Sequence, residues 1–561
     1  MEARCGIVPA RLDPAELAEF HFGRAKLFDR RRTRRLVRTA RLMMSHPGGT
    51  LPHKLTERSD LVGLYRLMDG EHVTHQRVLE PHRRRTLEAM AAHEGVVLVL
   101  HDTTELDFSG IAALSGQLGQ IGKGAGRGYL CHNSLAVALN ADGGRTVLGL
   151  AAQVLHKRRE VPKGETPAQK RAHPGRESRL WPAGCERVGP APKGKLWVDV
   201  CDRGSDTFEF LRFEIEHGRH FVVRCAKDRN LHGQDHVGAD RLHRKLYAYV
   251  RDLPALGERT VQAAAGPGKK ARAARVRIAA GPVTLNAPER ARGHYDPGPL
   301  EAWAVHVREV DAPAGVVPLE WVLLTDLPAD TLQRAGQRVD WYEQRPLVED
   351  YHKGQKSGLG IQLTRFADAA RLEPMIALHS AVTAVLLGVR DAGRQARADL
   401  TPAAALVGRL HVTVLAAHSG RRARDRGPRA RPPVTADMSV RQFLTELARL
   451  GGYQARNSDG PPGWQTLWRG WEKLQLMVEG VAAILEENPC HVGIPDAPNT
   501  GTGGQVSGNA EALRMRGYTP KLALNTRLHP TGDFPRVRDL APFRATSFQQ
   551  QGIRKDFQPC R

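Results

Sequence analysis

The chain of 561 residues contains only seven cysteines, and their arrangement excludes two kinds of site. Their number is odd and no C-x-x-C pair occurs, so the sequence predicts neither a disulfide framework nor a zinc site of that pattern. The N-terminal segment lacks the apolar run of a signal peptide, and the most apolar later stretch, 375–389, is short and contains His379. We therefore expect a cytoplasmic protein with reduced thiols and no membrane contact, in which 375–389 forms a core helix.

Acidic residues are scarce relative to basic ones. The chain has 83 Lys and Arg against 60 Asp and Glu, a formal net charge of +23 and a pI near 10.1. Such an excess attracts polyanions, and the release of counterions makes nucleic-acid binding sensitive to salt. A basic proteome encoded by a GC-rich genome would produce the same imbalance, but we favour nucleic acid as the partner. The length predicts roughly three or four structural units.

Three common enzyme motifs are missing as well. The chain has no G-x-x-x-x-G-K-[ST] phosphate loop, no H-E-x-x-H and no G-x-S-x-G. The glycines within 119–128 do not have the spacing of a dinucleotide-binding fingerprint. These absences give no support to a phosphate-loop nucleotide hydrolase, a zinc protease of that type or a serine hydrolase.

Arginine is concentrated in the first 75 residues, which have a helical pattern. Seven arginines lie within 30–41, while Leu36, Val37, Ala40 and Met44 recur at helical spacing. One face of this helix is therefore apolar and the other cationic. A solvated charged face has the same pattern, but so little acidic compensation favours phosphate binding. The residues expected to contact DNA here are Arg30, Arg31, Arg34, Arg35 and Arg38.

Two apolar runs later in the chain each lead to an aspartate. Residues 96–100 precede Asp102 and residues 196–201 precede Asp202, which predicts two buried strands with a carboxylate at the C-terminal end of each. Further strands at 134–139, 146–154, 221–224 and 319–325, a helix at 205–217 and a surface excursion at 156–195 indicate an α/β domain with a mixed sheet. An aspartate at a strand end is more often a turn or cap residue, so this placement alone does not define a site.

A third carboxylate lies in a Y-x2-R-x3-E-x6-K pattern made by Tyr342, Arg345, Glu349 and Lys356. On a helix, residues three, four and seven apart share one face, so a carboxylate would lie between a phenol and two cations that suit phosphate oxygens. An ordinary amphipathic helix with charge pairs is the alternative. Phosphodiester chemistry with two divalent cations requires converging carboxylates, because Mg²⁺ prefers oxygen ligands.

Together these motifs resemble those of the DDE transposases of the insertion-sequence-four family, to which the transposon-five transposase belongs. The resemblance covers roughly residues 20–380, and its most specific part is the Y-x2-R-x3-E-x6-K signature. The other matching segments, in chain order, are His101–Thr104, the glycine-rich run 119–128, Val200–Asp206, Phe221–Arg224 and Glu320–Thr325. The match of Val200–Asp206 favours Asp202 over Asp199 as the second aspartate of the family pattern.

The resemblance implies an RNase H-like (retroviral integrase-like) α/β catalytic domain with a β-rich insertion, flanked by helical N- and C-terminal domains. The expected divisions are a DNA-binding domain at 1–75, the first catalytic part at 76–229, the insertion at 230–318, the second catalytic part at 319–375, a helical dimerisation region at 376–490 and a tail of unknown role at 491–561. The helical region is expected to contain helices at 438–450 and 464–487, joined to the preceding part by a basic linker at 421–433.

The resemblance also implies the chemistry. Asp102, Asp202 and Glu349 would be the catalytic residues and would bind Mg²⁺, for which Mn²⁺ can substitute. The protein would act on the double-stranded DNA of transposon ends and of the target, as a homodimer in the synaptic complex, at the nucleoid of a bacterium. It would nick one strand, form a hairpin and transfer the strand. Further DNA contacts are expected from Tyr342, Arg345, Lys353, Lys356 and Arg224, and from Trp321, which would stack on a flipped base.

One departure from the family pattern concerns the signature. Its best-known member has tryptophan after the signature arginine, whereas this chain has Pro346, which is tolerated mainly in a first helical turn. Either a helix begins near 345, or the DNA contact differs there. Two alternative functions remain: a catalytically inactive relative that acts as a DNA-binding regulator, and a host nuclease that cuts without joining.

Overall fold

The computed structural model describes residues 12–233, 242–263, 272–288, 298–426, 434–456 and 459–487. These residues belong to one compact unit. The segment 491–561, expected to be a tail, lies outside the described residues, as does the part of the expected linker from 427 to 433. The start of that linker, 421–426, is helical, because α14 (Arg409–Arg426) continues through it.

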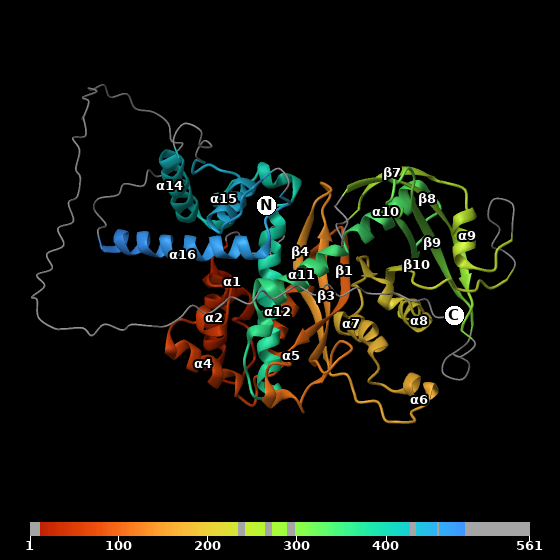
Figure 1. Cartoon of the computed structure of the whole chain (residues 1–561), viewed down its shortest axis with the longest axis horizontal. Helices are drawn as coiled ribbons and strands as arrows, with labels where there is room; N and C mark the ends of the chain where they lie inside the picture. The colour runs from red at the N-terminus through yellow and green to blue at the C-terminus, as the bar shows by residue number, and fades with distance from the viewer. Residues whose placement is uncertain are drawn as a thin grey trace, which may run out of the picture. The chain divides into compact units, whose positions relative to one another are not determined.

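The N-terminal part is helical, as its periodicity predicts. Asp13 and Asp29 accept hydrogen bonds from the first turns of the two helices that follow them, which satisfies backbone N–H groups at each helix start. In Figure 1 these helices, drawn in red, lie beside the long helix α12 (Ala369–Ala392). They are α1 (Pro14–Phe22), α2 (Arg30–Ser45), α3 (Leu51–Lys54), α4 (Arg58–Met68) and α5 (His75–Ala92).

A ten-stranded mixed sheet forms the centre of the molecule. Its parallel part consists of β1, β5 and β6, and the other pairings in this sheet are antiparallel. The strand order is β2 (Gly119–Gln120), β3 (Arg127–Leu139), β1 (Val96–Asp107), β5 (Leu196–Cys201), β6 (His220–Arg224), β10 (Glu320–Thr325), β9 (Leu300–Glu309), β8 (Arg272–Leu285) and β7 (Gly257–Ala263), with β4 (Arg145–His156) paired to β3. The mixed α/β class with helical flanks agrees with the sequence prediction.

The β-rich segment expected at 230–318 contributes to this same sheet. The full length of β10 pairs with residues 303–308 of β9, and β8 and β7 continue the sheet beyond β9. The helix α9 (Leu246–Asp252) packs against β8 and β9. The insertion therefore extends the sheet that carries the aspartates.

Two sequence predictions for the part of the chain before β5 were wrong. β1 does not end before Asp102 but continues to Asp107, because its antiparallel pairing with β3 extends from Val97 to Asp107. The stretch 156–195 is not only a surface excursion, because α7 (Leu180–Val188) packs against β3 and β4 and buries Leu180, Cys185 and Val188. The short helix α6 (Pro167–Ala172) precedes it, and α8 (Phe208–Glu216) follows β5.

The predicted core helix at 375–389 is part of α12. By length and composition α12 could cross a membrane, but 89% of its most apolar window is buried within the protein. Such burial is what a central helix of a folded domain requires. After α12 come α13 (Ala403–Val407), α14, α15 (Val440–Leu450) and α16 (Trp464–Glu487), of which the last two match the predicted helices.

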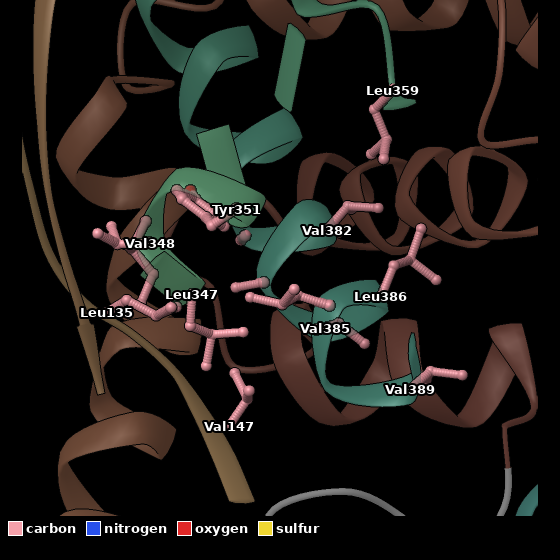
Figure 2. Close-up of a cluster of buried hydrophobic side chains, with 14 of the residues drawn as sticks. Leu135, Val147, Leu347, Val348, Tyr351, Leu359, Val382, Val385, Leu386 and Val389 are labelled. Atoms are coloured by element: carbon pink, nitrogen blue, oxygen red, sulfur yellow. The ribbon is translucent and has the colours of Figure 1, made fainter. Parts of the chain in front are cut away.

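Two helices between β10 and α12 carry the signature residues: α10 (Leu332–Glu343) and α11 (Pro346–Lys353). Figure 2 shows Leu347 and Val348 of α11 beside Leu135 and Val147 of the sheet, with Val385 of α12 on the other side. The apolar face of α11 is thus packed between the sheet and α12. This packing fixes the direction in which the polar face of α11 points.

Candidate active site

Asp102 and Asp202 lie next to each other at the end of the parallel pairing. β1 and β5 run in register up to His101 and Cys201, so each aspartate is the next residue on its own chain segment. Asp102 lies within β1, whereas Asp202 directly follows β5 and accepts a hydrogen bond from Gly204 N at 2.8 Å. The carboxyl end of parallel strands is where open α/β sheets place functional groups.

Arg345 joins these aspartates to Glu349. Its guanidinium lies 2.9 Å from Asp102 Oδ2 and 3.4 Å from Asp202 Oδ2, and it also forms an ion pair with Glu349. The side chains of Arg345 and Asp102 are only 12% and 14% exposed, whereas Glu349 is 49% exposed, so the cluster is open to solvent on the side of Glu349. The three carboxylates predicted from the sequence are therefore gathered around one cation.

The signature residues do not lie on one continuous helix. α10 ends at Glu343, and α11 begins at Pro346, which occupies the first helical position where a missing N–H costs little. Tyr342 therefore belongs to α10 and Glu349 to α11, with Arg345 between them. The first of the two readings of Pro346, a helix that starts near 345, is the observed one.

Burial controls the charge of Asp102. Its side chain is 14% exposed, and desolvation raises its pKa to about 6, although Arg345 opposes the shift. Asp202 and Glu349 raise the same pKa further, because like charges disfavour ionisation. Thr103 N donates to Asp102 Oδ1 at 2.9 Å and favours the charged form. The site holds more negative charge than Arg345 can balance.

Two polar residues that the sequence analysis did not single out support Asp102. His352 is buried and its Nδ1 lies 3.6 Å from Asp102 Oδ2, while Asn133 Nδ2 donates to His352 Nε2 at 3.0 Å. Burial, reinforced by the charges of Lys356 and Arg345, lowers the pKa of His352 to about 3, so the ring is neutral. The position of His352 in the signature, three residues after Glu349, was a signal that could have identified it.

The two lysines predicted as site residues, Lys356 and Lys353, differ in their surroundings. Lys356 is half-buried, and desolvation lowers its pKa, while the charges of Glu105 and Asp102 oppose the shift. Lys353 is 67% exposed, and its ammonium lies 4.0 Å from a carboxylate oxygen of Asp350. Lys356 is thus close enough to Asp102 for their charges to interact, whereas the ion pair of Lys353 is with Asp350.

Trp321 and Tyr342 form a buried aromatic pair. Their ring centroids are 5.3 Å apart in an edge-to-face arrangement, and only 8% of Trp321 is exposed. Arg224 of β6 is half-buried, donates to Glu320 O at 3.4 Å, and its charge opposes the rise that burial causes in the pKa of Tyr342. In this structure Trp321 therefore has no open face for a base.

The C-terminal helices contact the end of the signature segment. A π-helical turn covers Gly354–Gly358, and a Cβ atom added at Gly354 would meet Trp464 of α16 at 2.6 Å. The indole of Trp464 donates to Asp350 O at 3.1 Å. Arg390 of α12 also pairs with Asp350 at 3.1 Å, so α11 is held from two sides.

A buried ionic network lies on the opposite face of β1 and β5, behind the carboxylates. Asp199 accepts from His101 Nε2 at 2.9 Å and pairs with Arg219 at 2.7 Å. Burial opposes the ionisation of Asp199, but Arg219 and His101 outweigh it and lower its pKa. Cys185 donates to Glu214 at 3.2 Å, and burial, with the charge of Asp199, raises the pKa of Glu214. The network links β1 to β5 through His101, one residue before Asp102, and Asp199, three residues before Asp202.

Replacing Asp199 with Ala is expected to destabilise the protein by roughly 3–5 kcal/mol, because buried Arg219 would keep only the more distant Glu214, at 3.5 Å, and His101 would lose its acceptor. The measurement is urea unfolding followed by tryptophan fluorescence. Asp311→Ala is the matched control, because Asp311 pairs with Arg275 at the surface and surface pairs contribute roughly 0–1 kcal/mol. Equal unfolding midpoints for the two variants would contradict a structural role for the network.

The arginines of α2 also divide into two groups. Arg30, Arg31 and Arg34 are exposed, whereas Arg35 and Arg38 pair with the buried Asp60 of α4 at 2.8 and 2.5 Å. A hydrogen bond from Arg38, with the charges of both arginines, lowers the pKa of Asp60 despite its burial. Arg35 and Arg38 therefore hold α2 against α4, and part of their charge is already neutralised.

Comparison with known protein families identifies the N-terminal helices. Residues 14–73 match the family model described as "Transposase DNA-binding". The match spans α1 to α4 and most of the connection between α4 and α5, and it includes the arginines of α2. It supports a transposase that binds DNA through this segment.

Proposed function

We propose that this chain, with its transposase-type DNA-binding segment, is a DDE transposase with an RNase H-like catalytic domain, resembling the insertion-sequence-four family. The observation that carries the proposal is the convergence of Asp102, Asp202 and Glu349 around Arg345. Three carboxylates from distant parts of a chain, in one partly buried cluster, are the arrangement that metal-dependent phosphodiester chemistry requires.

The residues of the cluster fit divalent cations with oxygen ligands. Asp102, Asp202 and Glu349 would hold them, because all three offer carboxylate oxygens and together carry more negative charge than the guanidinium of Arg345 balances. When bound, Mg²⁺ or Mn²⁺ would supply an activated attacking oxygen and stabilise the leaving oxygen. The raised pKa of Asp102 is itself a sign of uncompensated negative charge in a desolvated site.

The other side chains of the cluster suit the handling of a DNA phosphate. Arg345 can exchange its carboxylate partners for phosphate oxygens, and Lys356 offers a second cation from the turn after α11. The neutral His352 lies 3.6 Å from Asp102, beyond hydrogen-bond distance, and, because Asn133 donates to its Nε2, carries its ring proton on Nδ1. Stacking of a flipped base on Trp321 would require Tyr342 to move from its present contact.

The reaction we propose is cut-and-paste transposition. The protein would nick one strand at the transposon end, form a hairpin, reopen it and transfer the strand to target DNA, as a homodimer that pairs two ends. The test uses a duplex selected for tight binding from a random pool and incubated with Mg²⁺. Nicking followed by joining supports a transposase, binding without cutting in Mg²⁺ or Mn²⁺ supports a regulator, and cutting without joining supports a nuclease.

The affinity for Mg²⁺ is expected to fall as the pH is lowered through about 6, because the pKa of Asp102 is raised to about 6 and the ion competes with a proton for it. Below that pH the half-saturating Mg²⁺ concentration should increase by about tenfold per pH unit for one displaced proton. Without metal, the same raised pKa means that stability is lost as the pH rises through about 6.

The measurement is the Mg²⁺-dependent shift in melting temperature between pH 5 and 8. In Asp102→Asn the pH dependence of the half-saturating Mg²⁺ concentration should disappear, because the position no longer ionises. Asp340→Asn, which changes an exposed carboxylate of α10, should behave as the wild type. A half-saturating concentration that does not change with pH in the wild type would argue against Asp102 as a ligand.

A further inference from the structure

We infer that Phe28, between α1 and α2, is an apolar wedge that packs against base edges of the bound DNA duplex. This inference rests on DNA being the partner of the N-terminal segment, and it adds a base-contacting residue to the arginines already described. The Phe28 side chain is 72% exposed, whereas its neighbour Leu27 is buried. An exposed phenylalanine in a DNA-binding segment is the type of residue that architectural DNA-binding proteins insert between base steps.

The backbone of Phe28 is in a conformation that phenylalanine rarely adopts. Its φ is +63°, in the left-handed region where glycine is preferred. The turn is required because Leu27 enters the core while Asp29 caps α2. Holding a bulky residue there costs about 1–3 kcal/mol, and its exposed ring recovers little of that by burial. A strained, solvent-exposed aromatic residue thus points to a role outside the fold itself.

The ring is held in place by two neighbours. The His72 ring lies 4.5 Å from it, centroid to centroid, and the Arg77 guanidinium lies 4.5 Å from the ring centroid. A cation beside an aromatic face is attracted to it, which restricts the ring before DNA binds. Preorganisation of this kind lowers the entropy cost of inserting a side chain into a duplex.

Basic residues predominate around the ring, although Arg84 and Arg85 pair with Glu80 and Glu88. Phe28 lines a hollow of about 710 Å³ between the α1–α2 connection and α5, next to the exposed Arg30 and Arg31 at the start of α2. The basic residues of the hollow outnumber its three glutamates, Glu71, Glu80 and Glu88. The basic residues that line the hollow are Arg24, Lys26, Arg77, Arg84 and Arg85. A duplex whose backbone follows these cations would bring its groove to Phe28.

The test compares wild type with Phe28→Gly, which removes the ring and relieves the strained φ. The probe is a duplex selected for tight binding to the wild type from a random pool, with 2-aminopurine placed at successive positions. The wild type should increase the fluorescence at one step, because an inserted ring unstacks the bases. The variant should lose that increase and bind about tenfold or more weaker, consistent with a stacking contact. Its dependence on salt should not change, since no phosphate contact is lost.

Val317→Gly is the matched control, because Val317 is 73% exposed and lies outside the DNA-binding segment. It should bind as the wild type, while Phe28→Trp should retain the fluorescence increase. The melting temperature of Phe28→Gly should equal or exceed that of the wild type, which excludes misfolding as the cause. Wild-type affinity in Phe28→Gly, or no fluorescence change in the wild type at any position, overturns the inference. Neither result affects the proposed transposase, which metal-dependent nicking tests separately.

Discussion

Replacing Asp102 or Asp202 with Asn, or Glu349 with Gln, is expected to reduce DNA nicking by about a thousandfold or more, while duplex binding changes by less than about twofold. Each substitution keeps the side-chain volume but removes a charged oxygen ligand. The N-terminal arginines that would bind DNA lie on separate elements from this cluster, so binding should survive. Arg345 would also lose one of its carboxylate partners in each variant.

The measurement is the single-turnover nicking rate on the selected duplex in Mg²⁺, with affinity measured separately in the absence of metal. Asp340→Asn is the control for a lost carboxylate, because Asp340 is 52% exposed and pairs with Arg259 rather than with the cluster. A variant of Asp102, Asp202 or Glu349 that nicks at the wild-type rate would remove that residue from the proposed catalytic set.

The combined substitution of Arg30, Arg31 and Arg34 with Ala is expected to weaken duplex binding by about a hundredfold near 0.1 M salt. These three side chains are exposed on one helix within the matched DNA-binding segment. If each neutralises one phosphate, the slope of log affinity against log salt should fall by about 0.9 per arginine. The helix itself should remain folded, because the buried residues of α2 and the Asp60 contacts are unchanged.

Two controls separate this effect from general loss of charge or fold. Arg397→Ala removes a cation that is 76% exposed and lies far from the matched segment in sequence, so binding should be unaffected. Arg38→Ala should lower the melting temperature, because it leaves Asp60 with one partner fewer. A triple variant with unchanged affinity and salt slope would place the DNA-binding face elsewhere.

The sequence was sufficient for features that depend on local pattern. Apolar runs predicted β5 and β10, and helical spacing predicted α15 and α16. The three carboxylates could be chosen because each follows a run or a spacing that is readable along the chain. Their meeting around one guanidinium could not be read, because it depends on the parallel register of β1 and β5 and on the packing of α11.

The wrong predictions have physical causes in tertiary structure. The mostly polar segment from Asp102 to Asp107 was not predicted as strand, yet pairing with β3 keeps it extended. The helix α7 is preceded by a polar, proline-rich stretch, and its apolar residues gain burial only once the sheet exists. The pairing of Arg35 and Arg38 with Asp60 was not predicted, because no local pattern indicates it, and their contact with DNA stays a prediction.

The contact between Trp464 and the signature segment limits how this protein can be shortened. Both glycines of the π-helical turn face that indole, and the same indole donates to a carbonyl of α11. A truncated chain that ended before α16 would lack Trp464 and would leave the C-terminal end of α11 exposed to water. A fragment that carries the proposed catalytic residues but lacks α16 is therefore expected to lose the observed geometry of α11, and engineering by fusion or domain exchange should keep α11 and α16 from the same parent.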